Sequence, residues 1–317
     1  MPVTIQAGLP AEETLQRENV FYMNKERAAS QDIRPLQVVI LNLMPQKSVT
    51  ETQLIRLLGN TPLQVELTFL STASYQSKNT KVSYLKSFYQ HFEDIQDKKF
   101  DALIVTGSPV EKLRFEEVQY WDELTTILDW AEQNVYSSLF VCWGAQAALY
   151  HYHKIEKRPL EKKLSGVFAH TVVSSTETLV RGFDETFLAP HSRHTTVSGR
   201  DVEQVPSLKI LSTSEEAGVY LVASKDERQV FITGHAEYDA LTLDTEYKRD
   251  LKAGLSPDKP QHYYPGDNEG RMPPLSWRSH ASLLFSNWLN YYVYQKTPYA
   301  LEDLPLQSSS RPMVIPS

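Results

Sequence analysis

Residues 137–149, SSLFVCWGAQAAL, decide the fold of this chain. Residues 137–142 are a short apolar run, which predicts a buried strand, and they lead directly into a helical segment that begins at Trp143. A sharp strand–turn–helix junction can close here without steric conflict because the residues after the cysteine are small: Gly144, Ala145, Ala147 and Ala148. Such a junction presents one side chain at the edge of a sheet, and here that side chain is Cys142.

Strands and helices alternate over the first 150 residues. Residues 37–43, 65–70 and 101–106 are apolar runs typical of buried strands. Residues 48–51 (SVTE) fit a capping box that would open a helix ending before Gly59, and residues 115–133 have a long helical pattern. The alternation predicts an α/β fold with a mostly parallel central sheet and helices on both faces. Further strands are predicted at 166–173, 208–212, 218–222 and 230–233, and further helices at 241–253 and 277–292.

Composition and charge limit the classes of function that this protein can have. The 317 residues are 41% hydrophobic and 22% charged, as in an ordinary globular protein, and the net charge of −7 argues against nucleic-acid binding. We find no signal peptide and no apolar run long enough to span a membrane, so we expect a cytoplasmic protein. We predict an N-terminal arm at residues 1–35, a single α/β catalytic domain at 36–300 and a disordered C-terminal tail at 301–317.

Cys142 is the only cysteine, so an intrachain disulfide or a cysteine-built metal site is excluded. A lone cysteine is either a small core residue or a nucleophile. The N-terminus of the helix behind it supplies unpaired N–H groups and positive potential, which favour the thiolate. The N–H of Trp143 would point toward an oxyanion formed at an attacked carbonyl. Ligands bind outside the carboxyl ends of parallel strands, where residues 107–111, Cys142 and His235 are all predicted to lie.

Residues 230–237 (VFITGHAE) supply a candidate base. They predict a strand that ends in His-x-Glu, and a period of two would place His235 and Glu237 on the same side. A carboxylate in that position can hold one imidazole nitrogen and orient the other toward a thiol. A hydrogen-bonded surface histidine is the simpler alternative. Together with the cysteine junction, the pattern predicts a Cys142–His235–Glu237 triad.

These motifs resemble the class I glutamine amidotransferases, which have a C-x-G-x-Q elbow and an H-x-E pair. Two departures are informative: Phe140 replaces the usual glycine two residues before the cysteine, and residues 106–111 (TGSPVE) replace a Gly-Gly-Pro-type turn. With residues 42–45 (NLMP) and 190–194 (PHSRH), they make the chain similar to the homoserine O-acyltransferase family over about residues 1–300. The resemblance implies a class I glutamine amidotransferase-like, flavodoxin-like three-layer sandwich.

The resemblance also implies the reaction. Cys142 would take the acetyl group of acetyl-CoA, with the oxyanion held near Trp143 and by residues 42–45 or the Gly107 loop. L-Homoserine, deprotonated by His235, would then accept the acetyl group in a step of methionine biosynthesis. No cofactor is implied, since acetyl-CoA is a substrate, and the family suggests a homodimer.

Three further positions match substrate-binding residues of the family: Lys163, Ser192 and Arg249. Arg249 suits bidentate binding of the homoserine carboxylate, and Ser192 matches a position near the acceptor hydroxyl. The basic run at 154–163 could meet coenzyme A phosphates, although a solvated helix end is the commoner meaning of such a run. His191 and His194 lack a third ligand in the sequence, so we predict no metal site.

Glu111 matches the family position that separates acyl donors, where glutamate resembles acetyl-CoA users and glycine succinyl-CoA users. Charge repulsion gives a physical reason for this difference, because two like charges about 4 Å apart repel by about 4 kcal/mol at an effective dielectric near 20. A carboxylate at Glu111 would therefore disfavour the carboxylate of a succinyl group. A solvent-exposed glutamate that opens a loop is the simpler alternative.

Three other functions remain open at this point. A homoserine O-succinyltransferase would use the same triad with the other donor. A glutaminase or γ-glutamyl hydrolase of the same superfamily would release ammonia from glutamine. A non-catalytic binding module would carry an inert, slowly alkylated Cys142.

Overall fold

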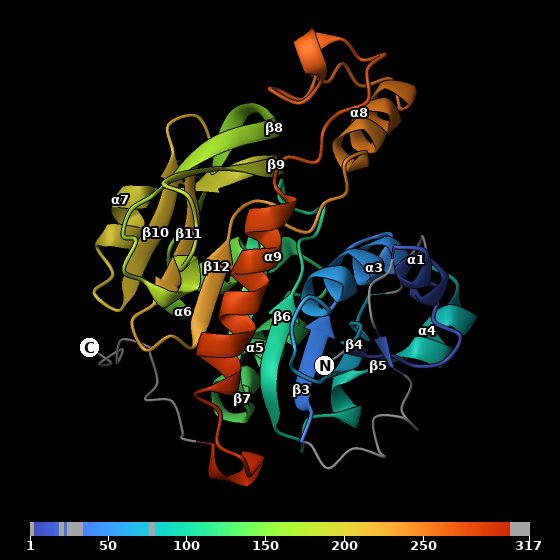
Figure 1. Ribbon diagram of the computed structural model, residues 1–317, viewed down its shortest axis with the longest axis vertical. Helices are drawn as coiled ribbons and strands as arrows, with labels where there is room; N and C mark the ends of the chain where they lie inside the picture. Colours follow the sequence, from blue (N-terminus) through green and yellow to red (C-terminus); the bar gives the residue numbers. More distant parts are fainter. Residues whose placement is uncertain (1–2, 19–21, 24–33, 76–79, 305–317) are drawn as a thin grey trace.

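The computed structural model describes residues 3–18, 22–23, 34–75 and 80–304 of the chain. Its strands form one sheet, in the order β2-β1-β4-β3-β6-β7-β12-β11-β10-β8-β9, with β5 paired to β4 (Figure 1). Strand pairing is parallel from β2 as far as β12, and antiparallel from β12 to β9. β12 is therefore the boundary between a parallel half and an antiparallel half.

The parallel half follows the sequence closely. Each of its five central strands lies within about two residues of its predicted bounds: β3 (Leu36–Leu41), β4 (Val65–Leu70), β6 (Phe100–Val105), β7 (Val135–Val141) and β12 (Gln229–Ile232). β6 is buried along its whole length, as expected for a strand covered on both faces. The described part of the predicted N-terminal arm adds β1 (Val3–Thr4) and β2 (Tyr22–Met23) to this edge of the sheet.

Only part of the antiparallel half departs from the predictions. The strands predicted at 208–212 and 218–222 are present, and the one predicted at 166–173 is the last part of a longer strand. Residues 190–194, for which no strand was predicted, lie within β9 (Thr186–Val197). Most of the basic run lies in β8 (Lys157–Val172), after the preceding helix ends at His153. The two strands pair from Lys157↔Val197 to Thr171↔Thr186, so long-range pairing outweighs their polar composition. β10 (Leu208–Ser214) and β11 (Gly218–Ser224) complete this half.

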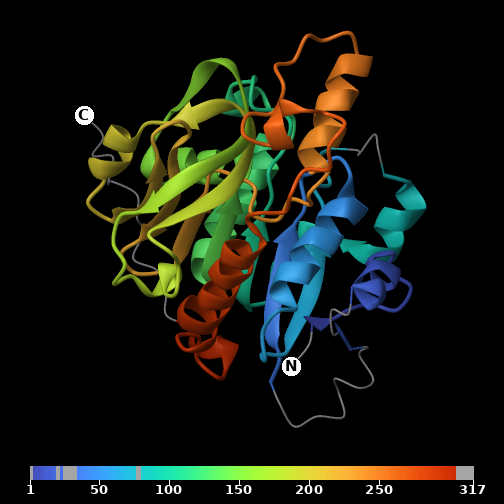
Figure 2. The same ribbon diagram turned by 45° about the horizontal axis from the view of Figure 1, so that its top comes forward.

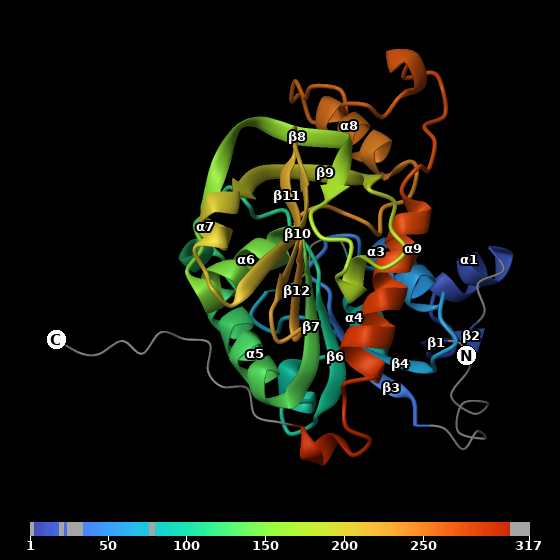
Figure 3. The ribbon, with the colours of Figure 1, turned by 60° about the vertical axis from the view of Figure 1, so that its left-hand side comes forward.

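Helices cover both faces of the sheet, as predicted (Figure 3). One face carries α1 (Ala11–Arg17), α3 (Lys47–Leu58), α9 (Arg278–Asn287) and the π-helix Trp288–Tyr294, and the other carries α5 (Trp121–Asn134), α6 (Trp143–His153) and α7 (Gly199–Glu203). The remaining short elements are α4 (Val82–Phe88), β5 (Tyr89–Gln90) and 3-10 turns at Phe92–Asp94, Phe115–Glu117, Thr178–Val180, Pro265–Asp267 and Leu301–Asp303.

The predicted capping box of α3 is wrong. α3 begins at Lys47 after Gln46, which makes no side-chain cap, so Ser48 already lies inside the helix. Glu51 is instead buried and accepts hydrogen bonds from the hydroxyls of Tyr84 and Tyr89. The helix ends at Leu58 before Gly59, as predicted.

α8 (Thr242–Lys252) and the segment after it project beyond the carboxyl ends of the parallel strands (Figures 1 and 2). This projection has its own apolar cluster, centred on Tyr263, Tyr264 and Trp277. It therefore stands over the sheet edge where Cys142 emerges. Within the described ranges, no helix has both the length and the apolarity to cross a bilayer. Residues 305–317 of the predicted tail lie outside the described residues.

Candidate active site

Cys142 occupies a strained turn between β7 and α6. Its backbone has φ 51° and ψ −113°, a conformation that a residue with a side chain adopts at a cost of about 1–3 kcal/mol. The turn is held by a hydrogen bond from the Cys142 N–H to the carbonyl of Ile232, 2.7 Å long. A Cβ at Gly144 would lie 2.6 Å from the carbonyl oxygen of Thr106, so only glycine fits there. The predicted elbow is therefore present in the backbone.

His235 and Glu237 follow β12, the strand beside β7. β12 ends at Ile232, so the two side chains come together in the loop after the strand and not through a strand period. The Nδ1 of His235 bonds Oε1 of Glu237 at 2.6 Å. The ring also stacks on Tyr238, with centroids 4.1 Å apart. The backbone N–H of His235 donates to Pro190 in β9, so both halves of the sheet hold the base.

The electrostatics favour a charged imidazole beside the sulfur. Burial alone would lower the pKa of His235, but the negative charges of Cys142 and Glu237 outweigh it and raise this pKa well above its usual value. A Cβ placed on Gly107 would lie 3.3 Å from both the Cβ of Cys142 and the Cε1 of His235. Cys142, His235 and the turn at Gly107 thus enclose one small space.

Two residues that adjoin this space, Trp143 and Gly107, have backbone N–H groups with no acceptor in the described part of the chain. The loop at residues 42–45 was the alternative source of the second N–H. Its N–H groups are already used, because Leu43 donates to Oγ1 of Thr106 at 2.8 Å and Met44 to Oδ1 of Asn42 at 3.1 Å. Pro45 has no N–H to give. The geometry therefore favours Trp143 and Gly107 as the oxyanion donors.

A pocket of about 290 Å³ opens over the thiol. It brings together most of the predicted site residues: Glu111, Cys142, Lys163, Ser192, His235 and Arg249. Glu237 lies behind His235 and does not line it. Among the residues predicted as substrate contacts, none is placed elsewhere in the fold.

One wall of this pocket is a charged network that α8 completes. Lys163 places its Nζ 3.1 Å from Oδ2 of Asp250 and 3.7 Å from Oε2 of Glu246. Oγ of Ser192 donates to Glu246 at 2.5 Å. Nε and Nη2 of Arg249 both donate to Asp250, which leaves Nη1 without a partner among the described residues. Positive and negative groups thus face the pocket together, as a zwitterionic ligand requires.

Sequence reasoning missed several residues of this site. Glu246 and Asp250 were not singled out, although their spacing of four on a predicted helix was a usable signal. Tyr238 donates to Oε1 of Glu246 at 2.8 Å, and no motif marked it. Lys47 is buried against the loop at residues 42–45, with its Nζ 2.5 Å from the carbonyl of Asn42, and burial lowers its pKa to about 8.

Glu111 lines the pocket, so the simpler alternative of a solvent-exposed loop glutamate is not what the structure contains. Its backbone carbonyl accepts a hydrogen bond from Lys157, 2.6 Å long, and Lys157 also holds the carbonyl of Leu113. Burial raises the pKa of the Glu111 carboxyl. The positive charges of His235, Lys163 and Lys157 lower this pKa, but by less than burial raises it. The side chain is thereby held near the thiol by a fixed backbone.

The histidines of β9 do not gather as metal ligands. His191 is buried and bonds His170, with 3.0 Å between their Nε2 atoms, whereas His194 lines the pocket. Within the described ranges, no three His, Cys, Asp or Glu residues are placed to hold a metal ion.

Residues 2–299 match the family model described as homoserine O-succinyltransferase. The chain belongs to this family. It is 56% identical over 304 residues to a homoserine O-acetyltransferase of Desulfitobacterium hafniense, covering 96% of this chain and 99% of the relative. It is 57% identical over 302 residues to a homoserine O-acetyltransferase of Geobacillus kaustophilus, covering 95% and 100%.

Solved structures agree on the fold. A glutamine amidotransferase of Thermotoga maritima superposes with a TM-score of 0.52 at 12% identity, covering 83% of this chain and 100% of that one. The crystal structure titled SMU.1228c superposes with a TM-score of 0.53 at 16% identity, covering 80% and 97%. The predicted amidotransferase-like α/β fold is confirmed.

Proposed function

We propose that this protein transfers the acetyl group of acetyl-CoA to the hydroxyl of L-homoserine. Family membership and the names of the relatives support homoserine acylation, a step of methionine biosynthesis. One observation carries the mechanism: the strained Cys142 lies between a buried His235–Glu237 pair and a charged wall. A nucleophile, its base and an acceptor site therefore share one pocket.

The first half-reaction acylates the enzyme. The Cys142 thiolate attacks the thioester carbon, and the tetrahedral oxyanion accepts hydrogen bonds from the Trp143 and Gly107 N–H groups. When the intermediate collapses, the bond from carbon to coenzyme A sulfur breaks, and His235 supplies a proton to that sulfur. The product is an acetyl-cysteine and free coenzyme A.

The second half-reaction passes the acetyl group on. His235, now neutral, takes the proton of the homoserine hydroxyl as the oxygen attacks the acetyl-cysteine. The carbon–sulfur bond breaks, which restores the thiolate beside the imidazolium. Arg249 binds the substrate carboxylate, Ser192 lies near the acceptor hydroxyl, and the carboxylates of Glu246 and Asp250 suit the substrate ammonium.

The choice of acetyl over succinyl rests on Glu111. Its carboxyl is at the edge of the thiol pocket, where a succinyl carboxylate would meet it. The relatives named as acetyltransferases support the same donor, although the family model carries the succinyltransferase description. A homodimer, a cytoplasmic location and independence of any cofactor stay predictions.

Intact-mass spectrometry under rapid quench tests the proposal. Wild-type protein mixed with acetyl-CoA should gain about 42 Da, one acetyl group, on Cys142, and homoserine should remove it. Cys142→Ala is the matched control and should gain nothing. Turnover without such an adduct would contradict the ping-pong mechanism. Release of ammonia from glutamine, with no adduct from acetyl-CoA, would favour the hydrolase alternative, and slow alkylation of an inert thiol would favour the binding module.

A further inference from the structure

A second cavity adjoins the thiol pocket and is larger than it. Its volume is about 670 Å³, within the usual range for ligand sites. The two cavities share five lining residues: Met44, Pro45, Ser108, Pro109 and Val110. They are therefore adjoining parts of one space that meet beside Cys142.

The thiol pocket itself has little room for a long donor. Its walls are the charged groups that hold the acceptor, including Lys163, Arg249 and Asp250. A thioester whose carbonyl lies on Cys142 must extend its long arm away from this wall. The shared residues are the side on which the larger cavity opens.

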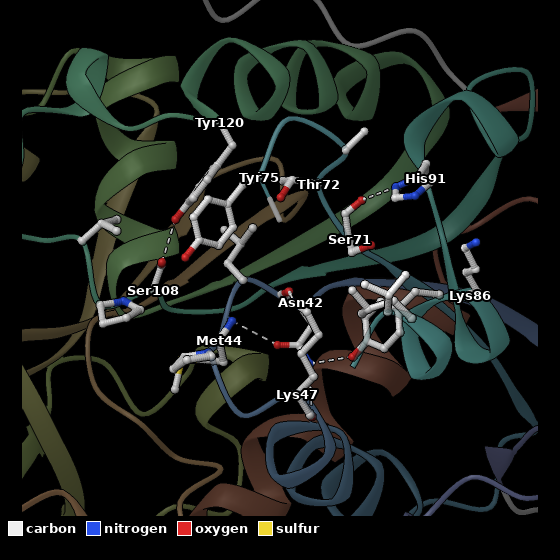
Figure 4. A pocket seen from close by; sticks show the side chains of 18 residues that line it. Asn42, Met44, Lys47, Ser71, Thr72, Tyr75, Lys86, His91, Ser108 and Tyr120 are labelled. Atoms are coloured by element: carbon white, nitrogen blue, oxygen red, sulfur yellow. Dashed lines mark hydrogen bonds between the residues drawn. The ribbon is translucent and has the colours of Figure 1, made fainter. Parts of the chain in front are cut away.

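The chemistry of the larger cavity changes along its length. Met44 and Ser108 lie at one side of the view in Figure 4, and His91 and Lys86 lie at the other. The end next to the thiol is apolar, with Met44, Pro45 and Val110. The far end reaches Lys86 on α4, an exposed lysine that has no ion-pair partner among the described residues.

A buried hydroxyl lies between these ends. Ser71, which follows β4, is 4% exposed and lines the cavity. Its Oγ has no hydrogen-bond partner in the described part of the chain, although its carbonyl lies 3.3 Å from Nδ1 of His91. Buried hydroxyls are nearly always paired, so an unpaired one that lines a cavity points to a polar ligand.

We propose that this cavity binds the pantetheine arm of the acyl-CoA donor, with Lys86 meeting its phosphates and Ser71 bonding an amide of the arm. The proposal rests on the proposed function. It places the donor and the acceptor on opposite sides of Cys142. It also moves the phosphate contact away from the basic run at residues 154–163, whose Lys157 is already bound to backbone carbonyls.

Steady-state kinetics with two donors tests the phosphate contact. Lys86→Glu should raise the KM for acetyl-CoA about tenfold at low salt and leave the KM for homoserine within about twofold. With S-acetylpantetheine, which has the arm but no phosphate, the same variant should match wild type. Lys98→Glu is the control, since it makes the same charge change at an exposed lysine just before β6. Equal effects on both donors, or no difference from Lys98→Glu, would overturn the contact.

Ser71→Ala tests the arm itself. It should raise the KM for both donors by about threefold to tenfold. Its melting temperature should be unchanged or higher, because the removed hydroxyl has no partner among the described residues of the free protein. An unchanged KM would overturn the contact between Ser71 and the arm. A clear loss of thermal stability together with lower kcat would assign Ser71 a structural role and would also overturn the proposal. Failure of wild type to acetylate Cys142 from either donor would instead overturn the proposed function.

Discussion

The two halves of the sheet build the site in different ways. The parallel half supplies the nucleophile and the oxyanion donors from two turns at strand ends, Gly107 after β6 and Cys142 after β7. The antiparallel half supplies Lys163 and Ser192 from β8 and β9, whose side chains meet carboxylates of α8. The nucleophile and the oxyanion donors thus come from local backbone geometry, and acceptor recognition comes from contacts between segments far apart in the chain.

This division separates the two half-reactions. Changes in the parallel half should affect the formation of acetyl-cysteine. Changes on the charged wall should affect only its transfer to homoserine.

Replacement of the nucleophile should have the largest effect. Cys142→Ser should lower kcat/KM by about 10⁴-fold or more, because a hydroxyl is far less acidic than a thiol at the same turn. Rapid-quench mass spectrometry should find no acetylated enzyme. A variant that retained more than a hundredth of the activity would show that Cys142 is not the nucleophile.

Glu237→Ala should come next, with a loss of about 10²–10⁴ in kcat/KM. The carboxylate orients His235 and stabilises its charge but touches no substrate, so some turnover remains. Both half-reactions should slow, since both use His235. Glu237→Gln serves as the isosteric comparison, and activity of the alanine variant within tenfold of wild type would remove Glu237 from the site.

Glu111→Gly should change the preference between acyl donors and leave the binding of the acceptor unchanged. If about 2 kcal/mol of the repulsion survives solvent screening, the ratio of kcat/KM for succinyl-CoA to that for acetyl-CoA should rise about thirtyfold. The KM for homoserine should stay near that of wild type. A wild-type preference for succinyl-CoA, or a glycine variant with no gain toward it, would contradict the assignment.

Arg249→Ala should affect only the second half-reaction. The KM for homoserine should rise about tenfold, as expected for loss of a charged hydrogen bond at a half-exposed site. Acetyl-cysteine should form at the wild-type rate in the absence of homoserine. Arg200→Ala, at an exposed arginine of α7, is the matched control. Slower acylation in the Arg249 variant would contradict the assignment of the two half-reactions to different halves of the sheet.

The smallest predicted effect is a change of donor preference with pH. Burial raises the pKa of Glu111, so its carboxyl becomes neutral at a higher pH than an ordinary glutamate. As the pH falls toward this raised pKa, the repulsion of succinyl-CoA should weaken, and the acetyl preference should fall by less than the change of about thirtyfold expected of Glu111→Gly. Glu111→Gln, which does not titrate, should hold a constant ratio. A constant ratio in wild type would mean that charge does not set the preference.

The same contrast explains what the sequence could predict. The strands of the parallel half were found because burial on both faces leaves a local apolar run. β9 was missed because residues 190–196, more than half of it, are polar or proline, and its burial depends on partners elsewhere. Arg193, for example, is 1% exposed and is held by the carbonyls of Thr195 and Ala217. In the site, the sequence motifs identified the residues that they contain. Glu246, Asp250 and Lys47 belong to no such motif, and their positions depend on how α8 and α3 pack over the sheet.

β12 joins the two halves, because it pairs with β7 on one side and β11 on the other and then leads to His235. The thiol and its base are thus far apart in the chain but come from adjacent strands. Neither could activate the other in a protein cut between β7 and β12 until the fragments re-paired along this strand. The rate at which Cys142 reacts therefore also reports on folding: a fast-reacting thiol indicates that β12 has paired with β7.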